Sequence, residues 1–341
     1  MARVAAAQMQ VQIYPTEDAF REVIFRWTAR ARAAGADLVA FPEGVGAMLV
    51  SQYLPAPLVK VLMAVYNETP GQSRGWGKQL LTRVVDKVSG MQDLPKTFNS
   101  TVAEHGAALR DSYKRVFAEA ARAHSLYVVA GSAYIPDEQT GEIINAAYLF
   151  DREGTCLGYQ PKVHLYIEDT HVCLPGESVR VFETEFGPIG LPICYEGMFP
   201  EVARAMAMKG AVGLVNVSAC PGELCFRKIR AGAWSRVQDN QVFGLHACLI
   251  GRNDLSKQFT DPYVGRSSVL APIDLTADYS GVLAEAAHLN QEELVVADWD
   301  FDRLRRLWES SDTRVRSEMR VDVLRRMMAE AFAPAEEAIR R

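Results

Sequence analysis

Apolar residues along this chain fall into short runs that alternate with stretches of helical spacing. Each short run is bounded by turn-forming or charged residues, which is typical of buried strands. In the first half of the chain, the predicted strands are 3–9, 36–44, 126–132, 143–150 and 154–160. In the second half, they are 188–196, 211–219, 242–251, 267–273 and 293–300.

Helical periodicity appears between these strands. Phe20, Ile24 and Trp27 lie on one face of a predicted helix that begins after Thr16, a good N-cap, and ends before Gly35. Repeated strand–helix alternation favours an α/β fold built of layers. A short turn joins 143–150 to 154–160, which indicates an antiparallel pair and therefore mixed sheets. The other predicted helices are 109–124, 200–210, 226–241 and the charged tail 301–333.

Residues 45–108 interrupt this alternation, because they contain no clear strand. An apolar stretch around Tyr66 is followed by a turn-rich patch at 69–77 and a helical piece at 78–90. We predict a helical insertion that forms a wall of the functional pocket, with Tyr66, Trp76 and Phe98 as candidate lining residues. The alternative is a helical excursion packed on the surface, since surface loops tolerate insertions well.

Composition narrows the classes of protein to consider. The chain has 341 residues, 49% of them hydrophobic, and no linker rich in Gly, Ser or Pro, which favours one large domain. The formal charge of −5 does not indicate the basic surface that is typical of nucleic-acid-binding proteins. No apolar run reaches the ~20 residues of a membrane helix. Gln8, Gln10 and Gln12 interrupt the N-terminal apolar run, so we expect a cytoplasmic protein without a signal peptide.

The six cysteines form no CxxC pair and are too sparse for a disulfide scaffold. Cys220, Cys225, His246 and Cys248 could be imagined as a zinc set, but their spacing fits no common structural site. We therefore expect reduced thiols, no metal and no cofactor.

Three reactive side chains lie where predicted strands end. Glu43 ends 36–44, Lys162 follows 154–160, and Cys194 ends the apolar part of 188–196. In α/β sheets, sites gather at such strand ends. A thiol, a carboxylate and an ammonium supply the nucleophile, proton acceptor and oxyanion stabiliser that covalent acyl transfer needs. Taken singly, each residue has a structural explanation, such as core packing or solvation.

The local sequences around these residues carry a family resemblance. FPEG at 41–44, PKVHL at 161–165 and ICYEGMFPEVAR at 193–204 occur in the order found in the nitrilase superfamily, the carbon–nitrogen hydrolases. The resemblance implies a four-layer α-β-β-α sandwich with mixed sheets over residues 1–300, followed by a helical extension at 301–341. It also implies pairing of subunits into a homodimer or higher oligomer.

The same resemblance implies roles for the three residues. Cys194 would be the nucleophile, Glu43 the general base and Lys162 the cation on the oxyanion side, with a backbone N–H near Tyr195 as a further oxyanion donor. Many members add a second acid in the loop after the lysine. Here Asp169 matches that position by spacing, and the neighbouring Glu168 is the alternative.

The leading functional hypothesis is hydrolysis of a linear, non-peptide amide or an N-carbamoyl compound. A nitrilase is the closest alternative. Tyr195 and the stretch FPEVAR favour an amide, whereas the long segment after Glu43 and the spacing of the lysine loop favour a nitrile. An acyltransferase and a non-catalytic scaffold remain further alternatives. The expected ligand is a small-molecule amide or nitrile.

Overall fold

The computed structural model describes residues 1–67, 94–253 and 261–332, and its strands form two sheets that meet at β1 (Ala2–Gln10). Most of β1 belongs to the first sheet, whereas its last residues, Met9 and Gln10, pair with β9 of the second sheet. The first sheet has the order β12–β1–β2–β3–β4–β5. Its other strands are β2 (Leu38–Ala40), β3 (Tyr127–Pro136), β4 (Ile143–Phe150), β5 (Cys156–Pro161) and β12 (Glu293–Trp299).

The second sheet has the order β6–β7–β8–β9–β10–β11. Its three central strands β7, β8 and β9 run parallel, and the outer ones are antiparallel to their neighbours. Both sheets are therefore mixed, as the pair 143–150 and 154–160 indicated. The strands are β6 (Val181–Phe182), β7 (Ile189–Gly190), β8 (Gly213–Ala219), β9 (Phe243–Ile250), β10 (Ser268–Leu270) and β11 (Val282–Glu285).

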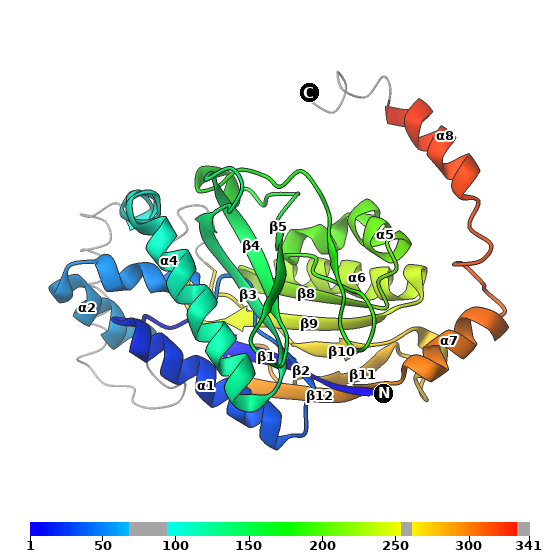
Figure 1. Ribbon diagram of the computed structural model, residues 1–341, viewed down its shortest axis with the longest axis horizontal. Helices are drawn as coiled ribbons and strands as arrows, with labels where there is room; N and C mark the ends of the chain where they lie inside the picture. The colour runs from blue at the N-terminus through cyan, green and yellow to red at the C-terminus, as the bar shows by residue number, and fades with distance from the viewer. Residues whose placement is uncertain (68–93, 254–260, 333–341) are drawn as a thin grey trace.

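Helices cover the outer face of each sheet, which gives four layers (Figure 1). On the first sheet lie α1 (Glu17–Ala33) and α4 (Leu94–His124), and on the second lie α5 (Pro200–Met208) and α6 (Gly222–Asn240). Thr16 caps α1 as expected, since its hydroxyl accepts a hydrogen bond from Ala19 N.

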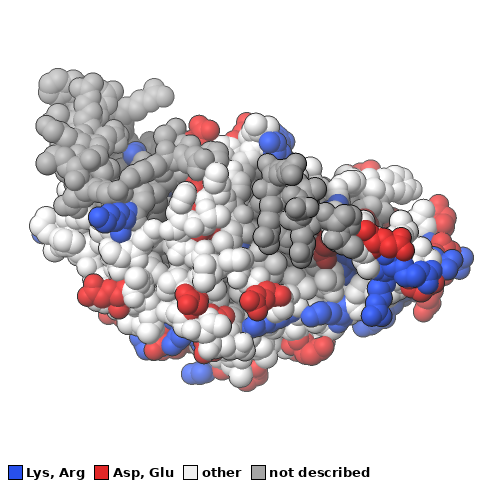
Figure 2. Space-filling model, turned by 90° about the horizontal axis from the view of Figure 1, so that it is seen from above, with Lys and Arg blue, Asp and Glu red and all other residues white. Residues whose placement is uncertain are grey.

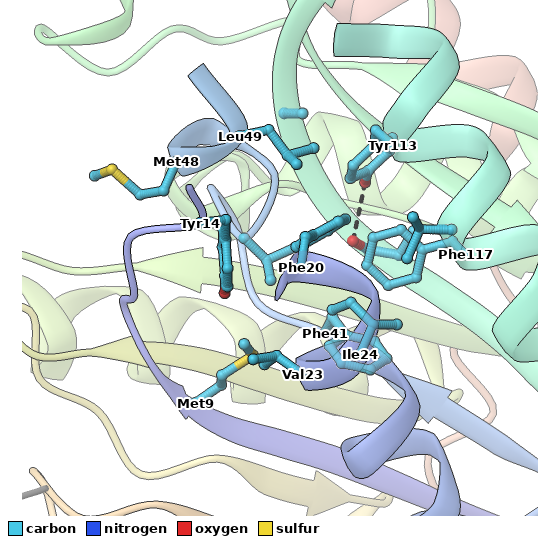
Figure 3. Packing of buried hydrophobic residues seen from close by; sticks show 14 of the residues in the cluster. Met9, Tyr14, Phe20, Val23, Ile24, Phe41, Met48, Leu49, Tyr113 and Phe117 are labelled. Carbon is cyan, nitrogen blue, oxygen red and sulfur yellow. Dashed lines mark hydrogen bonds between the residues drawn. The ribbon is translucent and has the colours of Figure 1, made fainter. Parts of the chain in front are cut away.

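One apolar core lies between α1, α4 and the first sheet, and another fills the space between the sheets. In the first core, Phe117 of α4 packs edge-on against Phe20, Phe41 and Tyr113 (Figure 3). The Tyr113 hydroxyl donates to Ala130 O on β3, also drawn in Figure 3. This contact ties α4 to the strand that lies beside the Glu43 turn.

The expected strand 188–196 is shorter than its apolar run suggested. Only Ile189 and Gly190 belong to β7, and Ile193 forms an isolated bridge with Val217. Cys194 instead begins the short 3₁₀ helix η3 (Cys194–Met198), with a left-handed φ of 46°. The apolar run does not reveal the turn at Cys194, because the residue would be buried whether it ended a strand or began a 3₁₀ helix.

The charged tail is two helices rather than one. The first, α7 (Phe301–Ser310), packs Leu304 and Leu307 against the body, whereas α8 (Val321–Phe332) has no buried residue and stands away from it (Figure 1). Acidic and basic side chains lie intermixed on the face shown in Figure 2. Several charges of the tail pair with one another, including Arg305 with Asp302 and Arg320 with Asp322.

In the expected insertion 45–108, the described residues before 68 form two short helices, η1 (Ala47–Tyr53) and α2 (Ala56–Tyr66). Its last part, from Leu94, is the first half of the 31-residue helix α4. The turn-rich patch 69–77 with Trp76 and the helical piece 78–90 lie outside the described residues. Within the parts of the chain that the structure describes, no helix is both long and apolar enough to span a bilayer.

A bulge in β3 shapes the turn that carries Glu43. The register of β3 against β4 shifts between Val129 and Ser132, where Gly131 has a φ of 70°. A Cβ atom at Gly131 would lie 2.1 Å from Pro42 O. The bulge brings Ser132 to the Glu43 turn, where its Oγ and carbonyl accept hydrogen bonds from Gly44 N and Gly46 N.

We expect Gly131→Ala to lower the free energy of unfolding by about 3 kcal/mol, because it adds a steric clash to a left-handed φ. Gly141→Ala is the matched control, since Gly141 has a φ of 77° and a Cβ there would meet no other atom within 4 Å. The control should lose only about 1 kcal/mol. Chemical denaturation of both variants measures the difference, and equal losses would show that the contact with Pro42 is unimportant.

Candidate active site

Glu43 lies in the turn that follows β2 and points into the space between the two sheets. Its carboxylate is buried and accepts three hydrogen bonds, from Lys162 Nζ at 2.7 Å, Asn145 Nδ2 at 3.0 Å and Ala219 N at 3.0 Å. The first two donors belong to the first sheet and its lysine loop, and the third ends β8 of the second sheet. Glu43 therefore joins the two sheets at the site.

Lys162 follows β5 directly, and its ammonium is 1% exposed. Its Nζ contacts Glu43 Oε1 at 2.7 Å and Asp169 Oδ2 at 2.6 Å. Burial by itself would lower the pKa of Lys162, but the charges of Asp169 and Glu43 raise it well above the ordinary value. The lysine is thus a fixed cation rather than a proton carrier at neutral pH.

Asp169 is the acid from the lysine loop that reaches Lys162. Tyr134 Oη and Tyr166 N donate to its carboxylate at 2.7 and 2.8 Å, and Asn145 Nδ2 lies 3.2 Å from Oδ1. Burial acts to raise its pKa, but Lys162 and these donors hold the pKa below the usual range. Glu168, the alternative, lines the neighbouring cavity. The shorter carboxylate therefore occupies the position next to the lysine.

Cys194 comes from the second sheet and meets this cluster through Ala219. Its Sγ lies 4.0 Å from Ala219 O, while Ala219 N donates to Glu43. A hydrogen bond with Cys220 lowers the pKa of Cys194, but burial and the charge of Glu43 raise it overall. The resting sulfur is therefore a thiol, which must lose its proton to become a nucleophile.

Backbone strain is stored at Cys194, because a φ of 46° is costly for a residue with a side chain. Glu196 holds this turn in place. Its buried carboxylate accepts from Ile193 N, before the cysteine, and from Val163 N, after the lysine, both at 2.7 Å. Glu196 thereby fixes Cys194 and Lys162 relative to each other.

Burial raises the pKa of Glu196 to about 7. A raised folded-state pKa stabilises the protein below the unfolded-state pKa, and this contribution is lost as pH rises towards 7. We expect the stability advantage of wild type over Glu196→Gln to shrink by roughly 3 kcal/mol between pH 5 and pH 8.

Denaturation with guanidinium chloride across this pH range measures the change in that advantage. A Glu196 difference that is flat or grows with pH would contradict the assignment.

Three groups that contact the candidate residues were not anticipated from the sequence. Tyr134 and Asn145 are cross-strand neighbours on β3 and β4, and both donate to Asp169 Oδ1. The signal available was weak, namely one amide side chain within the apolar run 143–150. The third missed group, Ala219 N, is backbone and gives no sequence signal at all.

The cluster opens to a cavity of about 650 Å³. Glu43, Lys162 and Cys194 lie at its base, with apolar walls from Met48, Phe98 and other residues. Of the candidate residues in 45–108, Phe98 thus lines the cavity, whereas Tyr66 is buried in the core beneath η1. Polar side chains around the rest of the cavity include those of Lys96, Asn99, Tyr134, Tyr166, Glu168, Asp169, His171, Asn253 and Tyr263.

Comparison with known families agrees with this geometry. The model of one family, carbon-nitrogen hydrolase, matches residues 3–308. The chain belongs to this family. The resemblance to the nitrilase superfamily that the three motifs carried is therefore confirmed.

Curated relatives of the chain include hydrolases of this family. This chain is 30% identical over 234 residues to the human omega-amidase NIT2. The match covers 62% of this chain and 76% of that protein. It is 29% identical over 215 residues to the probable hydrolase YhcX of Bacillus subtilis, covering 62% of this chain. That match spans only 41% of the Bacillus protein.

Solved structures confirm the four-layer fold. The amidase NitN of Nesterenkonia sp. AN1 aligns with a TM-score of 0.64 at 20% identity, covering 96% of this chain and 100% of that one. Nit3 of Saccharomyces cerevisiae aligns with a TM-score of 0.63 at 20% identity, covering 93% and 97%. At this level of identity, the likeness establishes the architecture and nothing finer.

Proposed function

We propose that the chain hydrolyses a linear, non-peptide amide or N-carbamoyl compound through a thioester on Cys194. The observation that carries this proposal is the meeting of a thiol, a buried ammonium and the Glu43 carboxylate at the base of one cavity. These groups together meet the requirements of acyl transfer: a nucleophile, a proton acceptor and a fixed positive charge.

In the acylation step, Glu43 accepts the thiol proton as Cys194 Sγ attacks the amide carbon. Negative charge develops on the carbonyl oxygen, which Lys162 Nζ and the backbone N–H of Tyr195 stabilise. Two of the three ammonium donors of Lys162 already point at Glu43 and Asp169, so its position is fixed before substrate arrives. Glu43 then gives its proton to the departing nitrogen, and ammonia or an amine leaves.

In the deacylation step, Glu43 removes a proton from water, which attacks the thioester carbon. Lys162 and Tyr195 N again stabilise the oxyanion, and the collapse of the tetrahedral intermediate releases the acid and the Cys194 thiol. Asp169 accepts from Lys162, Tyr134 and Tyr166 N, and in this proposal it acts by holding the ammonium in place at the cavity wall.

An amide is favoured over a nitrile by the relatives. The human relative is named an omega-amidase. Tyr195 after the cysteine points the same way. The cavity of about 650 Å³ is large enough for a short acyl chain beyond the reacting carbon.

Ammonia release from short unbranched amides, from their matched nitriles and from matched N-carbamoyl amines tests the proposal. We expect turnover of amides or N-carbamoyl compounds, and acylation of Cys194 in peptide mass spectra. Cys194→Ala is the negative control for both ammonia release and acylation. Turnover of the nitriles alone would make the chain a nitrilase, and acyl transfer to an added amine without hydrolysis would make it a transferase.

We also propose that the protein acts as a homo-oligomer in the cytoplasm. Exposed apolar side chains on η3, α5 and α6 support association, among them Met198, Met208 and Leu224. All six cysteines are free thiols, which suits a reducing compartment. Light scattering coupled to gel filtration measures the assembly, and a monomer at micromolar concentration would refute it.

A further inference from the structure

Three buried polar side chains lie beside the turn that carries Cys194. Asn216 and Ser218 are two residues apart on β8, so their side chains point to the same face of the strand. His246 on β9 is paired with Asn216 in the register of the two strands. All three are at most 4% exposed, and the proposed mechanism uses none of them. Buried polar groups are normally hydrogen-bonded, so their partners show what they hold.

The hydrogen bonds of these side chains run in one direction, towards Cys194. Asn216 Nδ2 donates to Cys194 O at 3.5 Å, and Ser218 Oγ donates to Asn216 Oδ1 at 2.6 Å. Because the serine hydrogen is used in that bond, the hydroxyl oxygen accepts from His246 Nε2, 2.9 Å away. Burial lowers the pKa of His246 to about 4, so at neutral pH the ring carries one hydrogen, on Nε2.

The Asn216 amide has one favourable orientation. Cys194 O is an acceptor, so the amide must offer it Nδ2, since the flipped amide would place two carbonyl oxygens together. Ser218 supports this orientation by donating to Oδ1. From the other side η3 packs closely on the amide, because a Cβ atom at Gly197 would lie 3.0 Å from Asn216 Nδ2. The amide is therefore held by both its partners and its packing.

The carbonyl that Asn216 holds belongs to the same peptide unit as Tyr195 N. In a trans peptide the C=O and the N–H point in opposite directions, so a donor that fixes Cys194 O also fixes the direction of Tyr195 N–H. This peptide unit follows a residue with a left-handed φ of 46°, a conformation that persists only where neighbouring groups support it. Asn216 supplies such support from β8.

We propose that Asn216, held by Ser218 and His246, is the positioning residue for the oxyanion-binding peptide between Cys194 and Tyr195. The inference rests on the proposed function, because an oxyanion forms when Cys194 attacks a carbonyl carbon. Asn216 acts by keeping Tyr195 N–H where the charge develops, before substrate arrives. Loss of its amide should therefore weaken binding of the tetrahedral state much more than binding of the substrate.

Three ligands of one chain length separate these two kinds of binding. They are the short unbranched amide that the wild type hydrolyses fastest, the matching aldehyde and the matching carboxylic acid. Cys194 Sγ adds to the aldehyde carbon, its proton moves to the aldehyde oxygen, and a tetrahedral thiohemiacetal forms without a leaving group. The acid binds in the same cavity without a bond to sulfur, so it measures the pocket alone.

Asn216→Leu removes the amide at nearly constant volume. We expect kcat and the affinity for the aldehyde to fall together by about 30-fold, less than the 100-fold or more that loss of an oxyanion donor itself costs. KM and the affinity for the acid should stay unchanged. Ser218→Ala leaves the amide without one of its supports and should lower the same two quantities by about 5-fold.

A ¹³C-labelled aldehyde gives a signature that a merely structural role would not produce. The carbon signal reports ionisation of the thiohemiacetal hydroxyl as pH is varied. The pKa of this hydroxyl should rise in Asn216→Leu, since the ionised oxygen has lost a well-placed donor.

Asn240→Leu is the matched control. Asn240 is also a buried asparagine, 1% exposed, and its Nδ2 donates to a backbone carbonyl, that of Arg236 at 2.8 Å. It ends α6, and its amide has no printed role at the Cys194 turn. The control should lose stability but keep the kcat and the affinity for the aldehyde of the wild type.

Equal losses of affinity for the aldehyde and the acid in Asn216→Leu would show that Asn216 shapes the pocket, and would overturn the proposal. An unchanged affinity for the aldehyde, or an equal fall in Asn240→Leu, would do the same. If Asn216→Leu does not fold, the smaller change Ser218→Ala decides by the same comparison. A wild type that forms no thiohemiacetal and hydrolyses no amide would instead refute the proposed function.

Discussion

Cys194→Ala is expected to abolish turnover, by about 10⁴-fold or more, while leaving the fold intact. Among the described residues, Cys194 is the one cysteine that lines the cavity together with Glu43 and Lys162. Cys194→Ser should be nearly as inactive, because a hydroxyl is a far weaker nucleophile at neutral pH. Steady-state ammonia release measures the loss, and thermal unfolding checks the fold.

The matched control for this variant is Cys248→Ala. Cys248 is also buried, at 1% exposed, and contacts His246 on β9 rather than Glu43 or Lys162. Both alanine variants remove one sulfur from a packed interior and should cost similar stability. Only Cys194→Ala should lack the acyl group on the tryptic peptide 181–204, which contains position 194. Full activity in Cys194→Ala, or loss of activity in Cys248→Ala alone, would show that Cys194 is not the nucleophile.

The layers of the fold could be predicted because their signals are local. Strand 143–150 and the Thr16-capped helix are fixed by periodicity and capping within a few residues of chain, and the structure has β4 at Ile143–Phe150 and α1 at Glu17–Ala33. The joining of the two sheets by β1 could not be predicted. It depends on the pairing of Met9 with Leu249, 240 positions along the chain, which no local pattern encodes.

In the candidate site, too, some features could be predicted from the sequence and others could not. Glu43, Lys162 and Cys194 each stand in a recognisable motif, so their meeting could be expected from the sequence. The groups that hold them could not, because Asn145 and Tyr134 sit in strands where they resemble core positions. Their function appears only when the register of β3 and β4 places them opposite each other beneath Asp169. The left-handed turn at Cys194 was missed for a related reason, since its strain is supported by Glu196 through contacts with two separate segments.

Glu43→Gln is expected to lower kcat by roughly 100-fold or more, because a carboxamide keeps the shape of the side chain but cannot accept a proton. Lys162 keeps its contact with Asp169 in this variant, so the buried ammonium remains paired and the fold should survive. Single-turnover acylation of Cys194, followed by mass spectrometry, separates slow attack from slow deacylation. Both steps should be slowed, since the proposal assigns a proton transfer by Glu43 to each.

Asp169→Asn distinguishes proton transfer from the simple presence of a charge. Glu43 and Asp169 each give one carboxylate oxygen to Lys162, at 2.7 and 2.6 Å, and each variant replaces one of these two carboxylates by its amide. Only Glu43 also meets Ala219, the residue whose carbonyl lies beside Cys194 Sγ. If Glu43 is the base, kcat must fall much further in Glu43→Gln than in Asp169→Asn, whose main effect is to loosen Lys162. Equal losses would mean that both carboxylates merely hold the ammonium, and the base would have to be sought elsewhere in the cavity.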